Sequence, residues 1–302
     1  MSPTAIALVL VAALLHAVWN IAAKKAGGDD RFALFSGGLL VVIWAPVGLW
    51  AAWGVIPHWG GREWGVVLAS AVVHLAYFQT LLRGYRLSDL TVVYPVARGT
   101  GPLLSSAGAV LLLGERLGLV GIAGVLAVTL GVFFIAGGPS LWAKAHDESQ
   151  RARADDAPLR RRVRAGLGWG AATGALIAGY TLIDAYAVKV MLISPLLVDY
   201  FGNVLRLPFL LPAALRDPAS LRTLWNAQWK YALVVALLGP FAYVLVLYAM
   251  KLAPLSHVAP AREVSMLFAA LIGGKLLGEG DRGLRIVGAL CIAAGVTALT
   301  LG

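Results

Sequence analysis

Residues 97–131 read ARGTGPLLSSAGAVLLLGERLGLVGIAGVLAVTLG, and they return in altered form as residues 261–295. At a constant offset of 164 residues, Arg98 matches Arg262, and the triplet Leu-Gly-Glu that ends at Glu115 recurs as well. Each copy places its arginine inside an apolar run, where a charge costs about 2.5–3.5 kcal/mol at the centre of a membrane helix. A hydrophobic chain that encodes one half twice is typical of membrane transporters.

The composition is that of a membrane protein. Of the 302 residues, 60% are hydrophobic and 13% are charged, and the mean hydropathy is +0.81. Soluble domains carry about 25% charged residues. Apolar segments of about 20 residues recur along the chain, each long enough to cross a hydrocarbon core of ~30 Å. The net charge of +10 resides mostly at segment ends and in one loop, a distribution that sets membrane topology. The expected partners are a lipid bilayer and a small molecule, with no nucleic acid.

Ten apolar spans can be placed, and together they predict an all-α membrane protein with ten transmembrane helices. The spans cover residues 3–23, 32–53, 64–84, 91–113, 118–137, 167–188, 195–215, 231–250, 255–276 and 283–301. A highly charged loop at 138–166 separates the first repeat, 1–137, from the second, 167–302. This loop is either a linker that sets topology or a surface that binds lipid or a partner. Because each half holds five spans, the second half enters from the opposite face, and the repeats are inverted.

The distribution of basic residues predicts which way the chain crosses the membrane. We call the face that holds both termini the termini side, and the face that holds the loop 138–166 the linker side. Four Lys and Arg residues belong to the termini side and 18 to the linker side, or 11 without the seven in the loop. The positive-inside rule then places the linker side in the cytoplasm and both termini outside the cell.

The two intramembrane arginines, Arg98 and Arg262, are the first candidates for a binding site. Each lies about seven residues into its span, or ~10 Å deep at 1.5 Å per residue, so inverted repeats bring both near the membrane midplane. Such a pair would hold a carboxylate or phosphate group. The alternative is a structural ion pair that locks helices together. Glu263, whose counterpart is Gly99, would accept a proton during coupling, bind a substrate amine, or neutralise a nearby arginine.

Polar aromatic and amide side chains form a second group of candidates. They are His16, Trp19 and Asn20 in the first span, His74 and Tyr77 in the third, and Tyr243 in the eighth. As the lining of a cavity they would suit an amphiphilic ligand, whereas the alternative is that they hydrogen-bond between packed helices. The histidines do not show the spacing of metal ligands and no carboxylate cluster accompanies them, so no metal site is predicted.

Other charged residues are expected at the bundle interior or at the membrane interface. Asp199 and Arg206 in the seventh span are seven residues apart and share a helix face as a networked pair. Asp184 in the sixth span should face the interior of the bundle. Glu115 and Glu279 follow Leu-Gly at span ends, where we expect them to lie at the interface and to fix the turn into the next helix.

The repeated residues resemble a known family. Leu-Leu-Gly-Glu-Arg at 112–116 and Leu-Leu-Gly-Glu at 276–279 are similar to the EamA repeat of the drug/metabolite transporter superfamily, and the segments 16–20, 94–99 and 259–264 resemble one branch of it. The resemblance covers nearly the whole chain apart from the central loop. It implies a carrier of two EamA repeats whose central cavity is lined by spans one, three, four, six, eight and nine. Relatives move amino acids, nucleotide sugars, amines and other metabolites, many as exporters, and are usually drawn with cytoplasmic termini.

The sequence therefore predicts a secondary transporter of the inner membrane that moves a small organic solute with an anionic group by alternating access, in the direction of export. Coupling to a proton or another ion and assembly as a homodimer are compatible with this prediction. No cofactor is expected, because the chain lacks a phosphate-binding loop. The alternatives are a flippase for a lipid-linked intermediate and an intramembrane enzyme, for which no cluster of acid, base and nucleophile appears.

Overall fold

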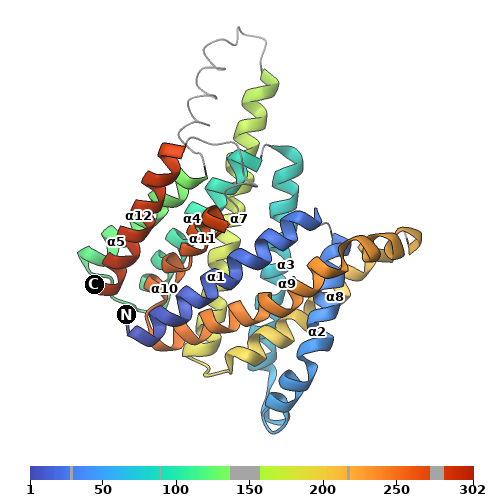
Figure 1. Ribbon diagram of the computed structural model, residues 1–302. Coiled ribbons are helices and arrows are strands. Elements are labelled where there is room, and N and C mark those ends of the chain that lie inside the picture. The colour runs from blue at the N-terminus through green and yellow to red at the C-terminus, as the bar shows by residue number, and fades with distance from the viewer. Residues whose placement is uncertain (28–29, 89, 137–156, 216–217, 273–281) are drawn as a thin grey trace.

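The computed structural model describes residues 1–27, 30–88, 90–136, 157–215, 218–272 and 282–302, which form a bundle of helices (Figure 1). In chain order the elements are α1 (Pro3–Ala26), α2 (Asp30–Ala52), the 3-10 helix η1 (Ile56–His58), α3 (Gly61–Leu87), α4 (Leu90–Leu112), α5 (Leu119–Ile135), α7 (Ala157–Lys189), α8 (Pro195–Leu215), α9 (Pro218–Leu252), α10 (Leu255–Ala261), α11 (Val264–Ile272) and α12 (Arg282–Leu301).

The helices follow the predicted spans, because in lipid the backbone N–H and C=O groups must be satisfied within their own segment. Six described helices are long and apolar enough to cross a membrane: Pro3–Ala26, Arg31–Ala52, Gly61–Leu87, Arg161–Lys189, Leu221–Leu252 and Gly283–Leu301. α4 and α8 are less apolar, since they carry Arg98 and Arg206 together with two internal prolines each. α5 is apolar but shorter, at 17 residues.

α7 starts earlier than the charge pattern predicts. The charged loop is predicted over 138–166, but α7 begins at Ala157. Its first turns hold Arg161, Arg162 and Arg164. Arginine is among the better helix formers, so the basic run continues the helix instead of ending it. The rest of the predicted loop and Glu279 lie outside the described residues.

The ninth predicted span, 255–276, is interrupted at its charged residues. α10 and α11 flank Arg262 and Glu263, which belong to neither helix. The N–H of Glu263 donates to the carbonyl of Pro260 at 2.9 Å, only three residues back, and the backbone tightens into a 3-10-like turn. In the described residues the ninth span is therefore two short helices joined at Arg262 and Glu263. The equivalent helix α4 is unbroken across Arg98.

α5 and α12, the last helices of the two halves, lie side by side (Figure 1). Glycines bring their backbones into contact: a methyl group built on Gly124 would lie 2.8 Å from the carbonyl oxygen of Gly295. A methyl group on Gly131 would lie 2.6 Å from the carbonyl oxygen of Gly288. The two helices therefore run antiparallel, and small residues permit the close approach on which packing in lipid depends.

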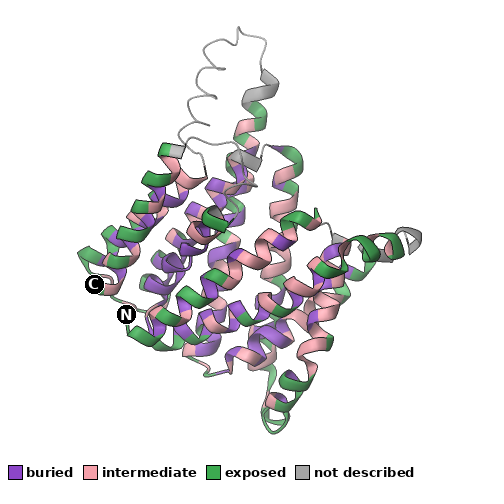
Figure 2. Ribbon diagram, in the orientation of Figure 1, coloured by how far each residue is buried: buried purple, intermediate pink, exposed green. Residues whose placement is uncertain are grey.

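Both chain termini lie at the same end of the bundle, and this end is closed by packing (Figure 1). The N-terminal ammonium of Met1 donates a hydrogen bond to the carbonyl of Thr300 at 3.1 Å. Buried residues gather around α10, all of whose residues are buried (Figure 2). The rings of Trp59, Trp64 and Phe201 pack together with centroids 5.0–5.9 Å apart, against the same core. The termini side of the predicted topology is thus the closed side.

Candidate functional site

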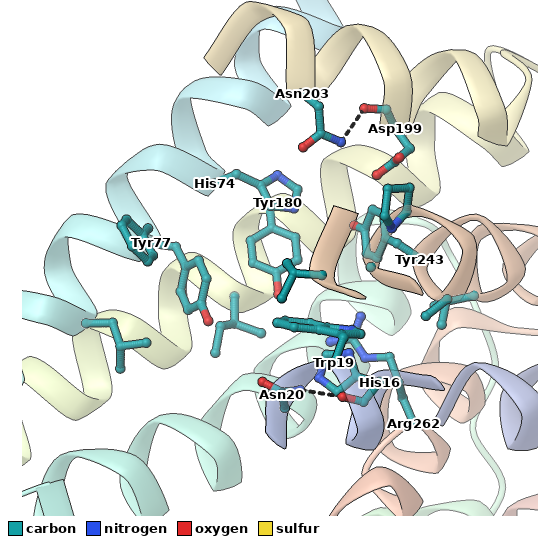
Figure 3. A pocket seen from close by; sticks show the side chains of 18 of the residues that line it. His16, Trp19, Asn20, His74, Tyr77, Tyr180, Asp199, Asn203, Tyr243 and Arg262 are labelled. Atoms are coloured by element: carbon teal, nitrogen blue, oxygen red, sulfur yellow. Dashed lines mark hydrogen bonds between the residues drawn. The ribbon is translucent and has the colours of Figure 1, made fainter. Parts of the chain in front are cut away.

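A cavity of about 450 Å³ lies among the helices of the two halves (Figure 3). The predicted substrate-binding residues that line it are His16, Trp19, Asn20, His74, Tyr77, Arg98, Tyr243 and Arg262. Glu263 does not line the cavity, because its side chain is buried behind Arg98. The resemblance did not imply a contribution from α2 or α8, but Ser36 and Asp199 reach the lining from these helices.

The two halves of the chain line the cavity differently. From the first half, its lining draws on the C-terminal parts of α1 and α3 and on the N-terminal halves of α2 and α4, which meet at the linker side. The opposite ends of these helices contribute to the packed core, for example Ala5 and Val9 of α1 and Ala109 of α4. From the second half, Asp199 of α8 and Val246 of α9 line the cavity from nearer the termini side. The cavity therefore lies in the middle of the bundle and extends toward the linker side between the helices of the first half.

Arg98 and Glu263 form an ion pair that joins the two halves of the chain. The Nε atom of Arg98 lies 3.5 Å from Oε2 of Glu263, whose side chain is 2% exposed. The ring of Tyr94 lies 5.8 Å from the guanidinium carbon of Arg98, a cation–π contact. Glu263 therefore neutralises the arginine of the other half and not Arg262, its neighbour in the chain. For Arg98 this geometry favours the structural interpretation over the anion clamp.

Arg262 has no such partner. It is 8% exposed and lines the cavity, and its guanidinium makes no ion pair or hydrogen bond with any residue that the structure describes. In Figure 3 it lies at the same end of the cavity as His16 and Trp19. The indole N–H of Trp19 is also buried without an acceptor among the described residues. A buried cation and a buried donor without partners are costly, and together they suit an anion.

Asp199, Asn203 and Arg206 reach the cavity from α8. Asp199 and Asn203 lie at the end away from Arg262 (Figure 3). The predicted ion pair between Asp199 and Arg206 is not found among the described residues. Instead Arg206 Nε donates to the carbonyl of Gly202 at 3.0 Å, and Asn203 Nδ2 donates to the carbonyl of Asp199 at 2.8 Å. Both side-chain groups bind their own helix, which leaves the Asp199 carboxylate at the cavity wall.

Aromatic rings form one wall of the cavity. His74 and Tyr180 stack with centroids 3.8 Å apart, and Tyr77 meets Tyr180 at 5.6 Å. His74 also contacts the edge of Tyr243 at 5.8 Å. Tyr180 is not among the predicted site residues. It lies 164 residues after His16, so the repeat offset makes it the equivalent of a predicted site residue. The wall presents flat apolar faces with polar atoms at their rims.

Asp184 lies behind this wall, in the interior as predicted. Its side chain is 0% exposed, and the hydroxyl of Tyr243 donates a hydrogen bond to its Oδ2 atom. His74 Nε2 lies 4.0 Å from the same oxygen. Within the described ranges no three His, Cys, Asp or Glu side chains gather as ligands for a metal ion. The acid, the imidazole and the phenol form a hydrogen-bonding group next to the cavity.

Glu115 stabilises the closed side, outside the cavity. The sequence predicts that it fixes the turn into the next helix. Its carboxylate instead contacts residues of the second half of the chain. It accepts hydrogen bonds from Lys189 Nζ at 2.6 Å and from the backbone N–H groups of Leu255 at 2.7 Å and Ser256 at 2.9 Å. Partial burial raises the pKa of Glu115, but these hydrogen bonds outweigh it and hold the pKa below its ordinary value. The ionised carboxylate thus caps the start of α10.

Comparisons with known proteins agree with this architecture. A crystal structure described as "Crystal structure of protein" superposes with a TM-score of 0.73, covering 100% of this chain and 98% of the other at 18% identity. An identity that low shows a shared fold alone. No curated protein matches the chain. The model of the EamA-like transporter family matches residues 3–137 and again residues 164–301. Because these matches cover nearly the whole sequence, the chain belongs to the EamA-like transporter family.

Proposed function

We propose that this protein is a secondary transporter that moves a small organic solute with an anionic group across the inner membrane by alternating access. Its family is one of membrane transporters of small molecules. The proposal that the solute is anionic rests on Arg262, a buried guanidinium at the cavity that makes no direct ion pair or hydrogen bond with the described residues. A carboxylate or phosphate would supply that charge through the paired N–H···O bonds that arginine favours. The free indole N–H of Trp19 would be a third donor.

The cavity suits a solute of modest size with a flat or apolar part. A volume of about 450 Å³ falls within the ~300–1,000 Å³ of small-molecule sites. The rings of Tyr77, His74 and Tyr180 offer faces for stacking. Asp199 lies at the end of the cavity opposite Arg262 (Figure 3). A solute that carries an amine as well as an acid, such as an amino acid, would contact both.

Two inverted repeats of five transmembrane helices would supply the alternating access. Two sets of contacts support the inversion. α7 is the repeat equivalent of α1, and α9 is the equivalent of α3. α1 packs against α9 and α3 packs against α7, so each contact between the halves has its equivalent. Between α5 and α12, Gly124 meets Gly295, the equivalent of Gly131, and Gly131 meets Gly288, the equivalent of Gly124. If the two halves exchanged conformations, the linker side would close and the termini side would open.

We assign the linker side to the cytoplasm, from its excess of basic residues, and both termini to the outside. The part of the cavity that α1 to α4 line then lies toward the cytoplasm, from which an exporter loads its solute. A cysteine introduced at Ser2 should react with an impermeant reagent in intact cells, whereas one at Ser149 should react only after the cells are opened. Reaction at Ser149 but not at Ser2 in intact cells would reverse the orientation.

Three solutes that share one skeleton and differ in charge test the substrate class. They are 3-phenylpropanoate, with a carboxylate alone, L-phenylalanine, with a carboxylate and an ammonium group, and phenethylamine, with an ammonium group alone. We expect proteoliposomes that contain the protein to transport the two carboxylates and not the amine. Arg262→Gln should lose this transport. The matched control Arg222→Gln removes an exposed charge away from the cavity and should retain it.

Two outcomes would overturn the proposal. Transport of phenethylamine alone, or carboxylate transport that is equal in Arg262→Gln and the unmodified protein, would reject the anion site at Arg262. Movement of a fluorescent lipid reporter without movement of any of the three solutes would favour a flippase instead. Melting temperatures of the purified variants would show that a loss of transport is not a loss of folding.

A further inference from the structure

Asp184 is a buried carboxylate with one oxygen left without a hydrogen bond. The Tyr243 hydroxyl of α9 donates to Oδ2, but Oδ1 has no hydrogen-bond partner among the residues that the structure describes. The side chain is fully buried. A carboxylate oxygen accepts hydrogen bonds or takes a proton, so Oδ1 of Asp184 has an open position for a proton.

His74 faces Asp184 with the nitrogen that is free to take a proton. Its Nδ1 atom lies 3.0 Å from the backbone carbonyl of Ser70, one turn earlier in α3. A carbonyl only accepts, so this contact favours the tautomer with a hydrogen on Nδ1, and the Ser70 hydroxyl, 3.3 Å from the same nitrogen, can accept from it as well. In the neutral ring Nε2 then carries a lone pair, and it points toward Oδ2 of Asp184 at 4.0 Å. A lone pair and a carboxylate cannot bond to each other until one proton is placed between them.

The groups that surround this pair come from all the helices packed around it. They are Ser70 on α3, Arg98 on α4, Tyr180 on α7, Asp199 and Arg206 on α8, Tyr243 on α9, and Arg262 between α10 and α11. Arg98 is balanced by Glu263. Asp199 and Arg206 are both on α8, where the charge of Arg206 favours the ionised form of Asp199. The ionised form of Asp184 is therefore the group that offsets Arg262 when the cavity holds no solute.

We infer that Asp184 and His74 form a proton-binding site that takes up one proton when an anionic solute binds at Arg262. The solute-linked part of this inference rests on the proposed function, whereas the proton site itself does not. Once the solute's carboxylate offsets Arg262, a proton from water binds to the lone pair of His74 Nε2 or to the carboxylate of Asp184. No covalent bond of the solute changes. The cavity keeps its net charge, so solute and proton cross the membrane together without net charge movement.

Calorimetry in two buffers of different ionisation enthalpy counts the protons taken up when 3-phenylpropanoate binds. For the unmodified protein we expect about one proton per bound solute near neutral pH, and for Asp184→Asn about none. His74→Gln should also lower the count and serves as the second variant where Asp184→Asn does not fold. The matched control Glu63→Gln removes a half-exposed carboxylate at the start of α3, outside the cavity, and should keep the uptake of the unmodified protein.

Infrared titration of the protein without solute tests the proton site separately. The carboxylic acid or imidazolium bands of the unmodified protein should contain a component that titrates with pH. This component should be absent from the spectrum of Asp184→Asn. Proton uptake in Asp184→Asn equal to that of the unmodified protein, or an unchanged infrared titration, would overturn the inference. If 3-phenylpropanoate still binds in a manner that depends on Arg262, the proposed function is retained and only the proton site is rejected. If 3-phenylpropanoate does not bind, the proposed function fails, and the infrared titration decides on the proton site alone.

Discussion

The arginines of the two halves hold equivalent places in the sequence and have different surroundings. Arg98 lies on the unbroken α4, with Glu263 3.5 Å away and the ring of Tyr94 beside its guanidinium. Arg262 lies at the break between α10 and α11 and has no ion-pair partner in the described part of the chain. The difference begins at one position, where the first half has Gly99 and the second has Glu263.

This comparison shows that equivalent residues of a duplicated protein can take different roles, one structural and one in ligand binding. The acid that only the second half encodes neutralises the arginine of the first half, so one charge pair holds the halves together. The arginine next to that acid in the chain stays free for a ligand. Two identical half-sites would place two unneutralised cations in one cavity, which is the more costly arrangement in a medium of low dielectric.

The largest expected effect comes from breaking the pair on the Arg98 side. Glu263→Gln leaves the partly buried guanidinium of Arg98 uncompensated, and we expect it to lower the free energy of unfolding by about 3 kcal/mol, the lower end of the range for buried ion pairs. Arg262→Gln removes a cation that has no partner and should change stability little. Denaturation of the two purified variants in the same detergent measures the difference. Equal losses of stability would mean that the two arginines are not distinguished by Glu263.

At the contact between α5 and α12, equivalent substitutions in the two halves should lower stability equally. A methyl group on Gly131 or on its equivalent Gly295 meets backbone atoms of the facing helix within 2.6–2.8 Å. Each alanine variant should therefore lose about 1–3 kcal/mol by overpacking. Gly168→Ala, at a helical site with open space around it, is the control and should be neutral or stabilising. Clearly unequal losses for the two equivalent glycines, measured by thermal denaturation, would argue against the inverted repeats.

Glu115 gives a smaller effect with a defined pH dependence. Its pKa lies below the ordinary value of 4.5, so the ionised group stabilises the fold at higher pH, and this contribution is lost as the pH falls through the folded-state pKa. Glu115→Gln should cost about 1 kcal/mol at neutral pH, because the amide keeps one acceptor oxygen for the backbone N–H groups and loses only the charge. The melting temperatures of variant and unmodified protein should converge in acid. A gap that stays constant down to low pH would exclude the ionised carboxylate as its source.

The smallest effect is expected for Arg206, the other cavity arginine without an ion pair among the described residues. Its Nε atom already donates to the carbonyl of Gly202, and it lines the cavity from α8, the helix whose Asp199 and Asn203 lie at the end away from Arg262 (Figure 3). A charge that does not contact the solute's anion acts through screening water, so Arg206→Gln should weaken binding of 3-phenylpropanoate about two- to five-fold. A loss as large as that of Arg262→Gln would place the anion between the two arginines.

Most helices were predictable, because an apolar run of membrane length satisfies the hydrogen bonds of its backbone only by forming a helix. Two features of the helices do not follow from hydropathy. The break at Arg262 and Glu263 depends on a hydrogen bond to Pro260 that hydropathy does not encode. The early start of α7 at Ala157 depends on the helix propensity of a basic run, which a charge count interprets as a loop.

The candidate site was predictable as far as it depends on polar residues within apolar spans. His16 and His74 stand out for that reason, and both line the cavity. The ion pair between Arg98 and Glu263 was not predictable, because depth along the membrane places both arginines alike and says nothing about rotation of the helices. The same limit applies to Asp199 and Arg206, whose spacing along one helix face predicts a pair that the side chains do not form.

The most direct test compares binding of 3-phenylpropanoate by calorimetry in Arg262→Gln and in the double variant Arg98→Gln/Glu263→Gln. The first removes the free cation, and the second replaces the ion pair with neutral amides of similar shape. We predict that Arg262→Gln weakens binding about 10- to 100-fold, the equivalent of a lost charge-assisted hydrogen bond of about 1.5–3 kcal/mol. The double variant should bind within a few-fold of the unmodified protein. Binding that survives in Arg262→Gln and is lost in the double variant would contradict the assignment of the anion site to Arg262.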